Sequence, residues 1–219
     1  MADIAALRRD PAAKAEAIRC LWQLSAAGGR RQSYLYAVLD AARDKRIYPR
    51  LRQLAGSELV VGLYQGRTAT ELAAVAPYLV CLGTIDRVFD WLWDQGWGES
   101  WGIFLWSLVS PETLRAHFRR LNMVQTEQKQ RLLFRFYDPR VLRSFLSTCD
   151  ATQLREMFGP VAAYMVESEE GDAIITYRGP DRLTTATTVI APPVIASEAK
   201  QSPAGGGTNP LGIASLRSQ

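Results

Sequence analysis

Strand-like and helix-like segments alternate along most of this chain, and this alternation limits the possible folds more than any other feature. Four short apolar runs are typical of buried strands: residues 34–39, 59–64, 78–82 and 101–108. The segments between them carry apolar side chains at helical spacing: residues 43–54, 68–75 and 85–93. Beyond these, a helix is expected at 110–121, a strand at 132–137 and two helices at 139–147 and 151–158. The alternation predicts an α/β fold with a mixed, mostly parallel sheet flanked by helices.

The composition divides the chain into three regions. Residues 1–30 contain one amphipathic helix and a glycine-containing linker, and residues 31–180 hold the predicted α/β domain. Residues 181–219 are rich in Thr, Ala, Ser, Pro and Gly and lack apolar periodicity, so we expect a disordered tail. Parts of this tail resemble a translated bacterial intergenic repeat, and we assign it no function.

The overall composition is that of a cytoplasmic globular protein. Of the 219 residues, 47% are hydrophobic, which is enough for a core without disulfides or metal. The three cysteines are far apart, as expected for reduced thiols, and no apolar run is long enough to span a bilayer. A net charge of +4 is too small to indicate nucleic-acid binding by itself. We therefore expect neither a membrane nor a nucleic acid as partner, although a nucleic-acid-binding module remains a third, weaker interpretation.

The sequence contains no recognisable catalytic, cofactor or metal site. His117 is the only histidine, no Gly-x-Ser-x-Gly motif presents a nucleophile, and no glycine-rich loop matches a phosphate-binding pattern. One histidine and three dispersed cysteines do not provide metal-ligand spacing. We expect no enzyme activity; the alternative is a hydrolase-like enzyme that uses His117 with Asp138 or Asp40.

The run from Arg135 to Pro139 is the most distinctive short motif. Asp138 is suited to cap the following helix, and Pro139 fits its first turn. Arg135 stands between two phenylalanines and is predicted to point inward, where it would pair with a carboxylate such as Asp40. A direct role in ligand binding is the alternative for this motif.

Five tryptophans fall between residues 91 and 106. Trp93 and Trp97 lie in a glycine-rich connection, where large aromatic side chains often anchor a protein interface. Ordinary core packing is the alternative. With the basic residues Arg119 and Arg120 of the predicted helix at 110–121, these tryptophans are the candidate partner-binding residues.

The order of several motifs resembles a known family. Leu-Asp-Ala-Ala at 39–42, Tyr-Gln-Gly at 64–66, Ala-Pro-Tyr at 76–78, Trp-Gly at 101–102 and Arg-Phe-Tyr-Asp-Pro at 135–139 occur in sequence. This order, across residues 33–165, is similar to the bacterial domain-of-unknown-function family 4123, the adaptor chaperones of type VI secretion. The residues that match the family pattern, expected to determine the fold, are Asp40, Pro77, Gly102, His117, Arg135, Tyr137, Asp138 and Pro139.

The resemblance also implies a function. It implies a cytoplasmic, non-catalytic adaptor that binds a secreted effector protein and loads it onto the spike protein of the secretion machine. The family is not known for catalysis. Its members often continue into a further helical lobe, whereas this chain has only a short strand region after about residue 164.

Overall fold

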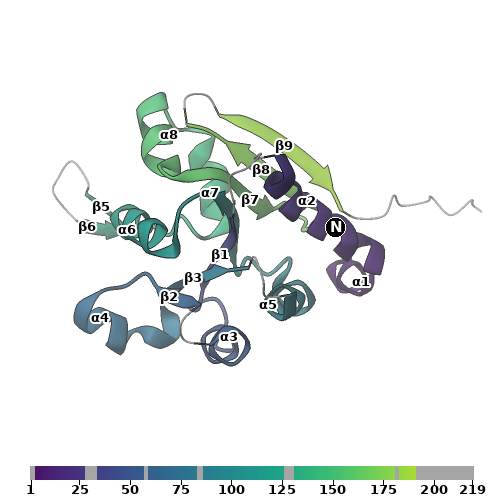
Figure 1. Ribbon diagram of the computed structural model, residues 1–219, viewed down its shortest axis with the longest axis horizontal. Coiled ribbons are helices and arrows are strands. Elements are labelled where there is room, and N and C mark those ends of the chain that lie inside the picture. Colours follow the sequence, from purple (N-terminus) through teal and green to yellow (C-terminus); the bar gives the residue numbers. More distant parts are fainter. Residues whose placement is uncertain are drawn as a thin grey trace, which may run out of the picture.

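A seven-stranded sheet forms the centre of the computed structural model (Figure 1). The structure describes residues 3–27, 34–56, 59–82, 86–125, 131–180 and 183–190. The strands follow the order β2-β3-β1-β4-β7-β8-β9 across the sheet. Their bounds are β1 Tyr34–Asp40, β2 Val60–Gly62, β3 Pro77–Cys81, β4 Gly102–Ser107, β7 Val161–Glu167, β8 Ala173–Arg178 and β9 Thr184–Val189.

Every neighbouring pair in this sheet is antiparallel, so the predicted mostly parallel sheet is wrong. Two helical connections, from β1 to β2 and from β3 to β4, join strands that run in the same direction, and each of these skips one position. The connections from β2 to β3 and from β4 to β7 also contain helices but join adjacent antiparallel strands. Strand β3 lies between β1 and β2, and β1 lies between β3 and β4. The inserted strand runs the opposite way, which makes each adjacent pair antiparallel. Alternation of strands and helices predicts such crossovers but not which strand occupies the position between them.

Helices cover both faces of the sheet, which explains the apolar runs of the strands. Successive residues of β1 alternate between two cores: Leu35, Ala37 and Leu39 belong to one, and Tyr36 and Val38 to the other. The first core contains residues of α1 (Ile4–Arg9), α2 (Pro11–Ala27), α3 (Ile47–Ala55) and α5 (Asp86–Trp91). The second contains residues of α6 (Pro111–Leu121), α7 (Pro139–Leu146) and α8 (Ala151–Phe158). A strand buried on both faces reads as continuously apolar whether its neighbours are parallel or antiparallel.

The two ends of the described chain join the same sheet and core. Helix α2 packs Ala17 and Leu21 into the first core, and the Leu21 carbonyl accepts a hydrogen bond from the Trp106 indole. Strand β9, within the region assigned to the tail, pairs with β8 along its length. The rest of the predicted tail, residues 191–219, lies outside the described residues. The three cysteines are free thiols. No helix in the ranges given above has the length and apolar character needed to cross a bilayer.

A short hairpin stands apart from the main sheet, beside α6 (Figure 1). It consists of β5 (Met123–Gln125) and β6 (Arg131–Leu133). The expected strand at 132–137 is therefore mostly wrong, because residues 134–137 leave the hairpin and lead into α7. This hairpin and α4 (Gly66–Glu71) flank the surface described below.

Candidate functional site

One end of the sheet brings together four of the residues that match the family pattern. Asp40 ends β1, Pro77 begins β3 directly opposite it, and Gly102 begins β4 opposite Leu39. The Arg135 guanidinium forms an ion pair with the Asp40 carboxylate, which confirms the predicted contact. Burial by itself would lower the pKa of Arg135. The hydrogen bond to Asp40 and the negative charge of that carboxylate outweigh this effect and raise the pKa of Arg135. This cluster joins the sheet to the segment before α7.

Gly102 is required by a close approach between strands. A Cβ atom at this position would lie 2.2 Å from the carbonyl oxygen of Val38. No side chain can occupy that space without moving the backbone of β1. Gly102 therefore serves the fold, as the sequence predicted for the family-pattern residues.

Tyr137, Asp138 and Pro139 lie buried at the start of α7. The Asp138 carboxylate accepts a hydrogen bond from the Arg140 backbone N–H, and Pro139 occupies the first turn, so the predicted cap is confirmed. Burial alone would raise the pKa of Asp138, but hydrogen bonds from Arg140 hold it below its ordinary value. Burial, with the neighbouring Tyr64 hydroxyl, raises the pKa of Tyr137. These side chains anchor the helix.

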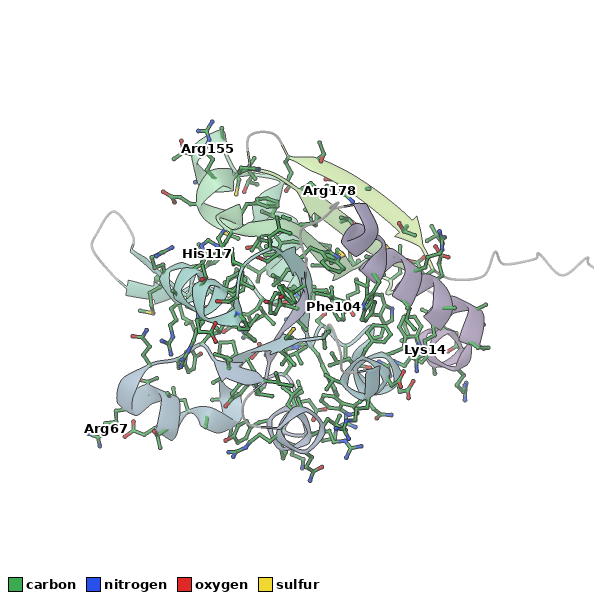
Figure 2. The ribbon with its side chains drawn as sticks, in the orientation of Figure 1. Lys14, Arg67, Phe104, His117, Arg155 and Arg178 are labelled. Carbon is green, nitrogen blue, oxygen red and sulfur yellow. The ribbon has the colours of Figure 1, made fainter. Side chains whose placement is uncertain are left out.

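His117 belongs to α6, and its imidazole contacts α8 (Figure 2). Its Nε2 is 3.2 Å from the Met157 carbonyl oxygen, and burial lowers the pKa of its imidazole. The hydrolase interpretation required His117 to reach Asp138 or Asp40, but those carboxylates are engaged by Arg140 and Arg135. These contacts give that interpretation no support.

Trp93 and Trp97 are buried, so the structure supports ordinary core packing and contradicts the alternative of exposed interface anchors. They are 1% and 3% exposed, respectively. The Trp93 indole donates a hydrogen bond to the Arg8 carbonyl, and the Trp97 indole donates to the Gly171 carbonyl. Helix α1 thus covers Trp93, and the turn between β7 and β8 accepts the hydrogen bond from the Trp97 indole. The sequence could not reveal this, because the covering residues are 85 and 74 positions away.

A buried carboxylate that the sequence did not single out fixes the same connection. Glu167 accepts hydrogen bonds from the backbone N–H groups of Gly98 and Ser100, at 2.7 and 2.8 Å. Burial raises the pKa of Glu167, while these two hydrogen bonds oppose the rise. The glycine-rich connection is therefore a packed structural element.

The remaining predicted residues, Arg119 and Arg120, lie on the outer side of α6 and line a surface groove of about 740 Å³. Arg115, one turn before Arg119, donates to the Gly62 carbonyl, and Arg119 donates to the Tyr64 carbonyl. Burial, with the nearby charge of Arg115, lowers the pKa of Arg119. The groove thus begins where α6 is tied to the segment after β2.

Exposed apolar residues form the other part of this groove. Leu72 follows α4, and Met123 and Leu133 come from the two strands of the hairpin. Each of these side chains is between 43% and 47% exposed. Asn122 also lines the groove, yet it is only 3% exposed, and neither its Oδ1 nor its Nδ2 has a hydrogen-bond partner among the residues that the structure describes. We call this surface the α4–α6 groove.

Sequence reasoning found the arginines of the α4–α6 groove but missed its apolar residues. Leu72, Met123 and Leu133 belong to three separate segments, and each apolar residue alone is typical of a core position. The only signal was the basic side of the helix at 110–121. No cluster of three or more His, Cys, Asp or Glu side chains suited to a metal ion occurs in the described ranges.

Comparison with known proteins identifies the domain. The model of a family described as "Domain of unknown function (DUF4123)" matches residues 35–156, which is more than half of the chain. The chain belongs to the DUF4123 family. No curated protein matches the chain, and no solved structure matches it.

The DUF4123 match begins within β1 and ends within α8. It includes the Asp40–Arg135 ion pair, the capped start of α7 and every residue of the α4–α6 groove. Helices α1 and α2 and strands β7, β8 and β9 lie outside the matched range. The candidate surface is therefore a feature of the DUF4123 domain itself.

Proposed function

We propose that this protein is a non-catalytic, cytoplasmic adaptor chaperone that binds a secreted effector and loads it onto the spike protein of a type VI secretion system. The order of motifs from Leu-Asp-Ala-Ala to Arg-Phe-Tyr-Asp-Pro, which resembles these adaptors, supports this assignment. The structural observation that carries the proposal is the α4–α6 groove, with its exposed apolar side chains and with arginines that form no ion pair to any described residue.

The apolar side chains of the groove favour a protein partner. Met123 and Leu133 protrude on a hairpin that is separate from the main sheet, and Leu132 beside them is 48% exposed. Clustered apolar groups of this kind mark interaction surfaces, because covering them removes apolar area from water at about 25 cal/mol per Å². The hairpin therefore gains stability when a partner covers it.

The remaining sequence motifs have structural roles, which suits a rigid adaptor. Asp40, Gly102, Asp138 and His117 each make contacts that fix the fold. These contacts hold the sheet and α6 in place. A surface on such a scaffold can bind a partner with little loss of conformational entropy.

Co-purification tests the proposal. The full-length tagged protein would be co-expressed with the effector and spike protein encoded beside it, and we expect both to be retained. A control variant, Arg178→Glu, changes an exposed residue of β8 away from α4 and α6, and it should retain both proteins as the unchanged protein does (Figure 2). Failure to capture either protein, while circular dichroism shows a folded chain, would contradict the adaptor assignment.

A further inference from the structure

We propose that the α4–α6 groove binds an acidic, aliphatic peptide segment of the partner, with its carboxylates on the arginines and its backbone on Asn122. This inference rests on the proposed adaptor function and specifies the chemistry of the bound segment. Three independent features of the groove carry it: its charge, a buried unpaired amide and its apolar wall.

The charge of the groove favours carboxylates. Arg115, Arg119 and Arg120 line it with a single acidic residue, Glu112. Across the described ranges, none of these three arginines forms an ion pair. A guanidinium has five N–H donors. Arg115 donates to the Gly62 carbonyl, and Arg119 donates to the Tyr64 carbonyl and to the Gln65 side-chain oxygen, which fixes both side chains and leaves part of their donors free. Carboxylates are the protein groups that match this donor geometry best.

The Asn122 amide points to a peptide backbone. A buried polar group without a hydrogen bond costs free energy, and Asn122 has two such atoms, one donor and one acceptor. A peptide main chain offers the complementary pair, a carbonyl oxygen and an N–H. Asn122 ends α6 directly before the hairpin, so a bound segment would satisfy it between the arginines and the apolar wall.

The apolar wall selects aliphatic side chains. Leu72, Met123 and Leu133 face the groove from α4 and the hairpin. A single-stranded nucleic acid is less well matched, because base binding uses aromatic stacking platforms and Tyr64 is the only aromatic residue among the described residues that line the groove. A segment with carboxylates on one side and aliphatic groups on the other fits all three features.

Fluorescence anisotropy with defined probes tests this inference on the full-length protein. The first probe is a fluorescein-labelled synthetic peptide of interspersed Glu, Leu and Ala residues. The second has Gln in place of every Glu, and the third is a labelled single-stranded oligothymidine. We expect the Glu peptide to bind, the Gln peptide to bind about tenfold more weakly, and the oligothymidine to bind more weakly than either.

Charge variants locate the binding site. Arg120→Glu is expected to weaken binding of the Glu peptide by about tenfold and to change binding of the Gln peptide much less. Arg178→Glu makes the same charge reversal on β8, outside the groove, and should leave both affinities unchanged. Equal losses in the two variants would show a nonspecific charge effect and would overturn the inference. Tighter binding of the oligothymidine than of the Glu peptide would overturn it as well.

Asn122→Leu provides a readout that a merely structural residue would not give. This variant removes the unpaired amide and keeps the branched shape and the number of side-chain heavy atoms, so we expect its melting temperature to rise while its affinity for the Glu peptide falls. A rise in melting temperature without any loss of affinity would contradict the role of Asn122. A fall in melting temperature would show that the amide is satisfied in the free protein, which would contradict it too.

The outcomes separate this inference from the proposed function. If Arg120→Glu still co-purifies with the effector and spike protein as the unchanged protein does, the groove is not the contact surface, although the adaptor function stands. If the Glu peptide binds in the groove but no effector or spike protein is captured, the groove chemistry stands and the adaptor function fails.

Discussion

Asp40 and Arg135 form an ion pair across 95 positions of the chain. The Asp40 side chain is 1% exposed, whereas that of Arg135 is 40% exposed. The carboxylate also accepts a hydrogen bond from the Ala42 backbone N–H at 3.0 Å. This pair connects the end of β1 to the segment that positions α7.

Arg135→Ala should lower the free energy of unfolding by about 2 kcal/mol, because it leaves the buried Asp40 carboxylate without its cationic partner. Urea denaturation of the full-length protein measures the change. The control is Arg67→Ala, which breaks an exposed pair with Glu71 at the outer end of α4 and should cost less than about 0.5 kcal/mol (Figure 2). Similar losses in both variants would contradict the structural role of the Asp40–Arg135 pair.

Gly102→Ala should destabilise the sheet by about 3 kcal/mol or prevent folding, because the new methyl group collides with the Val38 carbonyl oxygen. Gly62→Ala in β2 is the matched control. Its nearest neighbour would be a Tyr78 ring carbon at 3.5 Å, an ordinary contact. Thermal melting should separate the two variants clearly, and a Gly102→Ala protein as stable as Gly62→Ala would show that β1 and β4 lie farther apart.

Asp138→Ala should cost at least about 1 kcal/mol, since it removes the cap of α7 together with the carboxylate that pairs with Arg140. Asp138→Asn retains an oxygen that can accept from the Arg140 backbone N–H, so it should recover most of the loss. Chemical denaturation compares the two variants. Unchanged melting of Asp138→Ala would place the start of α7 elsewhere.

The buried His117 should make stability depend on pH. Its pKa is lowered by burial, assisted by the charge of Arg120, so the folded state binds fewer protons than the unfolded state below the ordinary value of 6.5. The free energy of unfolding should therefore fall as the pH falls from 6.5 through the lowered pKa.

His117→Gln tests this dependence, because glutamine does not titrate and can still donate to the Met157 carbonyl. Urea denaturation at several pH values between 7 and 5 should give a shallower loss of stability in the variant. Parallel pH profiles for the variant and the unchanged protein would assign the dependence to other groups.

Local features of the fold could be predicted from the sequence because they depend on near neighbours. Asp138 and Pro139 indicate the start of α7, because a helix cap involves only the residues of the first turn. The apolar run of β1 correctly indicates a strand buried on both faces. The local surroundings of Arg135, between Phe134 and Phe136, also indicated that it needs a carboxylate partner, and Asp40 at the end of a strand was a candidate for it.

Strand direction and exposure required the tertiary structure. Two helical connections, β1 to β2 and β3 to β4, skip a position that an oppositely directed strand fills, and two others join adjacent antiparallel strands. No local pattern specifies which of these arrangements a connection makes. The sequence left open whether Trp93 is an interface anchor or a core residue; in the structure it is covered by α1, with which it forms a hydrogen bond across 85 positions.

The sequence by itself determined where most of the strands and helices form, how α7 is capped and that Arg119 and Arg120 lie on a basic helix face. Only the tertiary structure decided that Leu72, Met123 and Leu133 share a groove with those arginines. The reason is physical: helix and cap signals extend over a few residues, whereas a groove forms only where distant segments pack side by side.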